Sequence, residues 1–224
     1  MRMRACADVW TDSAIEAAQR ALIAEQLATQ GYCVIPNYLD LAAQQALLAE
    51  ALAAQAGGLF RPGAVGHGQN RQVESEIRSM QLLWLDAQFP AQAAYLARMG
   101  LLMTDLNRRL FLGLRSCEAF FALYEPGDFY RRHCDNFLDA SPRKVTAVLY
   151  LNADWQADDG GELSLFDGDG ATPIARILPQ AGTLACFLSR DFPHEVCVTN
   201  RQRIAIPTWL RNDDPTIPLP PDVL

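Results

Sequence analysis

The hydrophobic pattern of the first thirty residues predicts a helix followed by a short strand. Alanine and leucine recur at helical spacing from residue 11 to residue 31. Thr11 or Ser13 can cap the start of this helix, and Gly31 can end it. The run GYCVIP, residues 31–36, then has the apolar character of a strand.

Two further helices are predicted before the middle of the chain. The second spans about 40–55, with Asp40 as its N-cap, and stops before two glycines. The third spans about 91–111 and repeats apolar residues every three or four positions, which indicates one buried face. Between them, residues 61–80 mix charge with glycine and proline, a pattern typical of a functional loop.

The pattern changes at about residue 116, where short apolar runs alternate with turn sequences. Eight or so strands at this spacing predict a sandwich, barrel or jelly roll. The fold class is therefore α+β. We expect one domain over 1–224, made of a helical support (1–115), a β-rich core (116–211) and an extended, proline-rich tail (212–224).

Composition narrows the choice of function. The net charge of -7 speaks against a nucleic-acid-binding protein, which usually carries a basic surface. No apolar run is long enough to cross a membrane or to form a signal peptide, so we expect a cytoplasmic protein without a membrane partner. The six cysteines show no C-x-x-C pair and are interpreted as free thiols.

The chain contains three histidines, and two of them suggest a metal site. His133 stands two positions before Asp135, and alternate residues of a strand point to the same face. His194 opens a later predicted strand and can supply a third ligand. Two imidazoles and one carboxylate form the facial triad of non-haem iron(II) oxygenases, which leaves coordination positions open.

An arginine follows the second histidine at a suggestive distance. Arg203 lies nine residues after His194, on the following stretch of the same predicted hairpin or strand. A guanidinium pairs bidentately with a carboxylate, so Arg203 could anchor a dicarboxylic ligand whose other end binds the metal. Arg201 is the alternative anchor, and the Tyr150 hydroxyl could donate a second hydrogen bond.

Other residues favour plainer interpretations. His67 is expected to be a solvated loop residue, and Cys134 should point away from its two neighbours. Trp84 and Trp209 are interpreted as core aromatic residues that border the site. A lone His-x-Asp motif is weak evidence, so the metal hypothesis depends on the whole set of residues in its β-rich context.

Several stretches of the β-rich half together resemble the prolyl 4-hydroxylase branch of the 2-oxoglutarate oxygenases. Within it, the chain is most similar to the hypoxia-inducible-factor prolyl hydroxylases and their bacterial relatives. The similarity covers residues 117–211 nearly continuously, with a weaker extension through EIRSMQLLWL. The matching stretches are YEPGDFYRRHCDN, KVTAVLYLNADW, GGELSLF, PHEV and RIAIPTW.

The resemblance implies a double-stranded β-helix, or jelly roll, with the N-terminal helices packed on one sheet. It implies iron(II) as the metal, and 2-oxoglutarate, dioxygen and ascorbate as further reactants. The implied catalytic metal ligands are His133, Asp135 and His194; the implied cosubstrate residues are Arg203, Tyr150 and Tyr124; the implied substrate-binding residues are Arg78, Arg143 and Trp209.

Two positions depart from the family pattern. Pro207 stands where the animal enzymes have a threonine near the metal. Met80 stands where they have an acidic residue in the substrate loop, which places the pairing of that loop with Arg143 in question.

The activity implied by the resemblance is prolyl 4-hydroxylation of a protein, with succinate and carbon dioxide as coproducts. Elongation factor Tu is the candidate substrate, and a monomer is expected. A hydroxylase of free amino acids with the same fold is an alternative, and the loop 61–80 should distinguish an open peptide groove from a closed pocket. A non-catalytic binding module is a third possibility, against which the intact ligand set argues.

Overall fold

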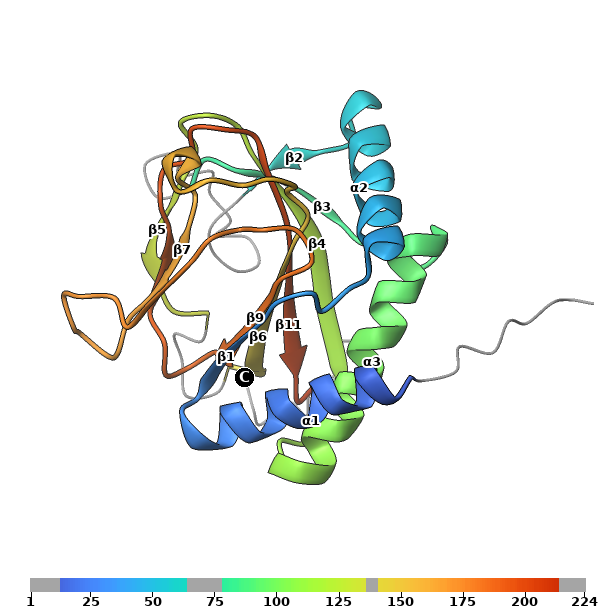
Figure 1. Cartoon of the computed structure of the whole chain (residues 1–224), viewed down its shortest axis with the longest axis vertical. Helices are drawn as coiled ribbons and strands as arrows, with labels where there is room; N and C mark the ends of the chain where they lie inside the picture. The colour runs from blue at the N-terminus through green and yellow to red at the C-terminus, as the bar shows by residue number, and fades with distance from the viewer. Residues whose placement is uncertain (1–12, 64–77, 136–140, 214–224) are drawn as a thin grey trace, which may run out of the picture.

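Two antiparallel sheets face each other, and three helices lie against the outer face of the larger sheet (Figure 1). The computed structural model describes residues 13–63, 78–135 and 141–213. Most of the predicted substrate loop 61–80, together with His67 and the C-terminal tail beyond residue 213, lies outside these ranges. The predicted α+β jelly roll with helices packed on one sheet is confirmed.

Capping residues mark the ends of the helices. Helix α1 (Ala14–Thr29) starts at Ser13, whose side chain forms a capping box with Glu16. Helix α2 (Leu41–Ala56) is capped by Asp40, which accepts a hydrogen bond from the Ala43 amide. Helix α3 (Pro90–Leu110) has proline at its first position and ends at Phe111 in the left-handed conformation. All three predicted helices agree with these bounds within one turn.

The larger sheet has seven strands in the order β1-β9-β6-β11-β4-β3-β2, and the smaller has four in the order β5-β10-β7-β8. A single-turn helix, η2 (Ala157–Asp159), lies between β6 and β7. The strand bounds are β1 (Tyr32–Ile35), β2 (Arg61–Pro62), β3 (Gln81–Trp84), β4 (Ser116–Tyr124), β5 (Tyr130–His133), β6 (Arg143–Tyr150), β7 (Leu163–Leu165), β8 (Ala175–Ile177), β9 (Leu184–Leu188), β10 (His194–Val196) and β11 (Arg203–Arg211).

The larger sheet separates two apolar cores. Successive side chains of a strand point to opposite faces, so each central strand contributes to both. On β4, Phe121 and Leu123 pack towards the helices, whereas Phe120 and Ala122 pack between the sheets. The core between the sheets is the one that surrounds the predicted metal site.

Trp84 departs from expectation, and Pro207 has an unusual place within a strand. Trp84, expected in the core, is 45% exposed and only meets the edge of the Phe120 ring. Pro207 lies in β11, the central strand between β4 and β6, although proline has no amide hydrogen for a ladder. The pairing of β11 with β4 accordingly skips Ile206 and Pro207 and resumes in the same register at Thr208.

Within the described part of the chain, no helix combines the length and apolar character needed to cross a bilayer.

Candidate metal centre

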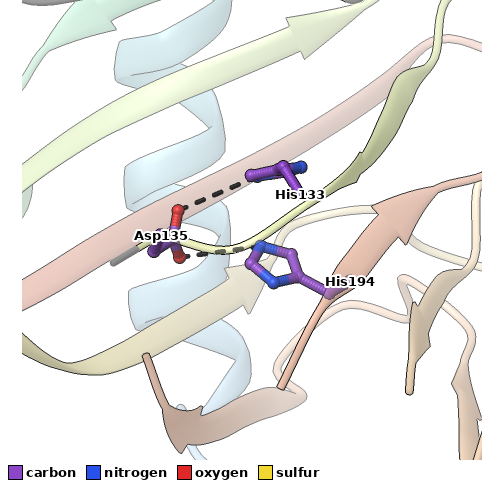
Figure 2. Close-up of side chains that lie close together, drawn as sticks. All are labelled: His133, Asp135 and His194. Atoms are coloured by element: carbon purple, nitrogen blue, oxygen red, sulfur yellow. Dashed lines mark ion pairs between the residues drawn. The ribbon is translucent and has the colours of Figure 1, made fainter. Parts of the chain in front are cut away.

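Three side chains, two on neighbouring strands and one just beyond a strand end, converge between the sheets. His133 ends β5, Asp135 follows two residues later, and His194 begins β10 (Figure 2). His133 Nε2 lies 3.8 Å from Asp135 Oδ1, and His194 Nε2 lies 3.6 Å from Asp135 Oδ2. The three candidate ligand atoms lie within 4.8 Å of one another, as close as one metal ion requires.

Strand pairing brings the two histidines together, and a bend brings the carboxylate. His194 is the direct cross-strand partner of His133, and their ring centroids are 4.3 Å apart. The expected alternation of a continuous strand is wrong for Asp135, because β5 stops at His133 and Asp135 lies in a bend beyond it. The side chains still converge, since the bend turns the carboxylate back towards the two rings.

Both histidines present the same nitrogen to the centre. The Nδ1 atom of His133 lies 2.8 Å from the Arg131 carbonyl oxygen, and that of His194 lies 3.1 Å from the Phe192 carbonyl oxygen. A carbonyl can only accept, so both Nδ1 atoms carry the hydrogen and both Nε2 atoms keep a free lone pair. Burial and the neighbouring His194 lower the pKa of His133 to about 3, so its ring is neutral at pH 7.

The larger sheet holds the carboxylate. Thr146 on β6 donates a 2.7 Å hydrogen bond to Asp135 Oδ2, and Ser189 lies 2.9 Å from the same threonine hydroxyl. Burial raises the pKa of Asp135, but the two histidines, Thr146 and the indole N–H of Trp209 together bring it below the ordinary value. The indole N–H does not reach a hydrogen bond of good geometry. Asp135 is therefore an anion at neutral pH.

A buried arginine lies behind this centre. Arg203 is 1% exposed, and its Nε donates a 2.8 Å hydrogen bond to the Gly161 carbonyl oxygen. Its guanidinium carbon lies 4.9 Å from the ring centroid of Tyr124 and 5.2 Å from that of Tyr150. The expectation that Arg203 shares a hairpin or strand with His194 is wrong, since Arg203 opens β11 in the larger sheet.

The surroundings of Arg203 are suited to an anionic ligand. Among the described residues, no carboxylate forms an ion pair with this guanidinium. The Tyr150 hydroxyl is buried and has no hydrogen-bond partner there. A buried charge without a counter-ion and a buried hydroxyl without a hydrogen-bond partner are costly, and a bound carboxylate would satisfy both. This donor set fits a dicarboxylate that also reaches a metal.

The histidines, Asp135 and Arg203 all line one cavity of about 480 Å³, its open mouth included. Arg78 and Trp209 line it too, as do both departures from the family pattern, Met80 and Pro207. Arg78 is 7% exposed, and its guanidinium lies over the Tyr130 ring at 4.9 Å. The cavity thus combines the predicted metal ligands with two buried cations.

Four other predicted residues do not line the cavity, and one of them is Tyr150, which is fully buried beside Arg203. Arg201 is half exposed at its side chain and pairs with Asp159 at 3.2 Å, which removes it as an alternative anchor. Cys134 does not belong to the cluster of candidate ligands, as expected. Arg143 lies over the Trp209 ring, with its guanidinium carbon 3.4 Å from the ring centroid.

Sequence reasoning missed several residues that shape the site. Thr146 and Ser189 fix the carboxylate, and Gly161 supplies the carbonyl oxygen that holds Arg203. The alternation of KVTAVLY places Thr146 on the same face as Tyr150, which was the one available signal. The contacts of Ser189 and Gly161 depend on the pairing of distant segments, which the pattern does not reveal.

Comparison with known proteins gives a consistent picture. Residues 119–211 match the model of the 2OG-Fe(II) oxygenase superfamily. Egl nine homolog 1 of Mus musculus is 30% identical over 200 residues, which are 82% of this chain and 47% of that protein. Its Homo sapiens counterpart is also 30% identical, with 44% of its length covered. The chain therefore spans about half the length of these curated relatives.

Solved structures extend the likeness to nearly the whole chain. A crystal structure of a Pseudomonas putida prolyl-4-hydroxylase is 39% identical with a TM-score of 0.78, over 87% of this chain and 100% of that one. A Trichoplax adhaerens prolyl hydroxylase, solved with a peptide fragment of the hypoxia inducible factor oxygen degradation domain, is 28% identical with a TM-score of 0.79. That match covers 88% of this chain and 91% of the other.

Proposed function

Because the chain belongs to the 2OG-Fe(II) oxygenase superfamily, in its prolyl 4-hydroxylase branch, we propose that it hydroxylates prolyl residues of a protein substrate. The family uses iron(II), 2-oxoglutarate and dioxygen. The observation that carries the proposal is the buried Arg203 in the same cavity as the cluster of His133, Asp135 and His194.

The three clustered residues are proposed to hold iron(II). Both imidazoles offer a free Nε2 atom, and the low pKa values of His133 and Asp135 keep these two ligands deprotonated at neutral pH. Iron(II), with 2-oxoglutarate and dioxygen, supplies the oxidant for C–H hydroxylation and yields succinate and carbon dioxide. Because all three residues line the cavity, a bound ion would be open to cosubstrate and substrate from that side.

Arg203 and the two tyrosines are proposed to anchor 2-oxoglutarate. The guanidinium would pair with the carboxylate far from the metal, and Tyr150 would donate its unpartnered hydroxyl hydrogen to the same group. Burial raises the pKa of Tyr150 and of Tyr124 above the ordinary value, so both phenols remain neutral donors. Tyr124 closes one side of the Arg203 guanidinium.

The proposed substrate-binding residues are Arg78, Trp209 and Arg143. The first two line the cavity, and the third covers the Trp209 ring. Loop 61–80, of which only the ends are described, is proposed to close over the peptide. The division into a helical support, a catalytic jelly roll and a tail within one domain is likewise a proposal.

Elongation factor Tu is the protein substrate that we propose to test first. Support comes from the similarity to a bacterial prolyl-4-hydroxylase. The choice of this factor rests on the sequence resemblance alone. A cytoplasmic location follows from the same proposal, since translation factors work there. We further propose that the enzyme is a monomer with ascorbate as reductant, which size-exclusion chromatography and ascorbate omission would test.

The test measures succinate release from 2-oxoglutarate with iron(II), oxygen and ascorbate, in the presence and absence of purified elongation factor Tu. The wild type is compared with His133→Ala, and mass spectrometry follows addition of about 16 Da, one oxygen atom, to the factor. We expect stimulated turnover and a hydroxyprolyl product, both lost in the variant.

The matched control is Cys134→Ala, which changes the residue next to the proposed ligand without removing a candidate ligand. It should retain turnover. Metal-dependent succinate release without stimulation by any prolyl protein or peptide would instead favour a small-molecule hydroxylase. Absence of turnover in metal-loaded wild type would overturn the proposed activity.

A further inference from the structure

Three residues form a straight row across the centre of the larger sheet. Trp209 on β11 is the direct cross-strand partner of Glu118 on β4 and of Thr146 on β6. Direct partners in an antiparallel sheet place their side chains on the same face. Since Thr146 reaches Asp135 on the inner face, Glu118 begins a row that ends at the proposed metal site.

An arginine joins the first two members of this row. Arg143 donates a 3.3 Å hydrogen bond to Glu118 Oε2, and its guanidinium carbon lies 3.4 Å from the centroid of the Trp209 ring. The Arg143 and Glu118 side chains are 19% and 26% exposed, so water screens the pair only in part. The carboxylate thus holds the guanidinium over the face of the indole.

The indole has little freedom left. Its ring is packed against Phe120 at a centroid distance of 5.3 Å, and the residue is 9% exposed while lining the metal cavity. Its buried N–H has no hydrogen-bond partner among the residues that the structure describes. The surface that Trp209 offers to a ligand in the cavity therefore depends on how firmly Arg143 covers the ring.

We propose that Glu118 is a positioning residue that, through Arg143, fixes the Trp209 indole in the orientation that receives the peptide substrate. The proposal rests on the proposed function for its substrate, and on the geometry of the sheet for its mechanism. A carboxylate on a central strand supplies the partner of Arg143, so the indole is oriented before any substrate arrives.

The chain contains a matched control for the removal of this carboxylate. Glu118 also forms an ion pair with Arg211, whose guanidinium makes two 2.8 Å hydrogen bonds to Asp213. Asp213→Asn removes one carboxylate from the same cluster but leaves the contact between Glu118 and Arg143. Glu118→Gln removes the charge that faces Arg143 with little change of shape.

The first readout is the indole N–H signal of Trp209 in a ¹H–¹⁵N spectrum of the full chain, assigned with Trp209→Phe. The chain has four tryptophans, so few such signals need to be separated. We expect Glu118→Gln and Arg143→Lys, which keeps the charge but not the flat guanidinium, to move or broaden this signal. Asp213→Asn should leave it in place.

The second readout separates KM from kcat with elongation factor Tu as substrate. Glu118→Gln should raise KM about three- to tenfold, as expected when a part-buried ion pair acts on a ligand through a neighbour, with kcat within about twofold.

Each outcome bears on one part of the inference. An unmoved Trp209 signal in both Glu118→Gln and Arg143→Lys would overturn the positioning role, whatever the substrate. If Asp213→Asn changes the Trp209 signal and KM as much as Glu118→Gln does, the charged cluster only stabilises the fold, and the positioning role of Glu118 is overturned. If wild type hydroxylates no prolyl protein while the signal still moves, the proposed function fails and the orientation of Trp209 by Glu118 stands.

Discussion

The hydroxyl of Thr146 donates a 2.7 Å hydrogen bond to Oδ2 of Asp135, and this bond joins the two sheets at the proposed metal site. Asp135 lies in a bend beyond the end of β5, where no ladder hydrogen bond fixes it. Thr146 belongs to β6, a central strand of the larger sheet. The central strand β6, through Thr146, therefore orients Asp135, which the hydrogen bonds of β5 do not hold in place.

Replacing Thr146 by valine keeps the shape of the side chain and removes this bond. Loss of such an outer partner typically costs about 10- to 100-fold in metal affinity, which is the expected effect. Metal titration of the apoprotein measures it. Ser189→Ala is the control, because it removes the 2.9 Å contact to Thr146 and retains the bond to Asp135. Equal affinity in Thr146→Val and wild type would contradict the role.

Arg203→Lys tests the proposed anchor of 2-oxoglutarate. Lysine cannot form the two parallel hydrogen bonds of a guanidinium, so KM for 2-oxoglutarate should rise by about tenfold or more, the loss expected of one charge-assisted hydrogen bond. Arg201→Lys, two positions earlier and paired with Asp159 on the surface, should leave KM unchanged. Steady-state succinate assays decide between the two arginines, and equal effects would argue against an anchor at Arg203.

Gly161→Ala should displace Arg203, the proposed anchor of 2-oxoglutarate, because Gly161 contacts its side chain. A Cβ at Gly161 would lie 3.1 Å from Arg203 Cδ and 3.0 Å from the Thr199 hydroxyl oxygen. Gly168 also has a positive φ, but a Cβ there would meet no atom of the described residues within 4 Å. Both alanine variants should lose about 1–2 kcal/mol of stability through backbone strain. Only Gly161→Ala should raise KM for 2-oxoglutarate, by roughly tenfold.

Alkaline pH should destabilise the fold through its buried tyrosines. Burial raises the pKa of Tyr38, Tyr95, Tyr124 and Tyr150, and that of Tyr130 to about 12, from the ordinary 10.0. A raised folded-state pKa gives stability that is complete below pH 10 and is lost as pH rises further. The unfolded chain releases these protons first, which lowers the free energy of unfolding.

Tyr38→Phe provides the measurement for this effect. The Tyr38 hydroxyl is buried and has no hydrogen-bond partner in the described part of the chain, so phenylalanine should cost little stability at pH 8. Above pH 10 the variant should lose stability less steeply than wild type, by about 1.4 kcal/mol per pH unit while the folded phenol stays protonated. Urea unfolding at a series of pH values measures both slopes, and parallel slopes would contradict the assignment.

The sequence was most informative where a residue type was rare or where an apolar repeat continued over many residues. Three histidines leave few ways to build a two-histidine site, and His133 with His194 was the pair that the structure brings together. Helix α3 was predicted from a repeat that extends over its whole length. The position of Arg203 was anticipated, but its sheet was not, because spacing along the chain does not say which sheet a strand joins.

Contacts that depend on strand neighbours could not be predicted. Glu118, Thr146 and Trp209 are far apart in the sequence and become adjacent only through the order β4-β11-β6. Short apolar strands fit many such orders equally well. The bend at Asp135 was missed for a related reason: an alternating pattern indicates a strand but does not mark the residue where hydrogen bonding stops.

The separation of two cores by one sheet has a consequence for how this chain can evolve. Along β4, Phe121 and Leu123 are subject to selection for a stable support, whereas Phe120 and Tyr124, which line the cavity, are subject to selection for what it accepts. Stability and substrate choice are therefore encoded in alternate codons of the same strand. A lineage could change its substrate by substitutions at every second position, while the intervening positions keep the support intact.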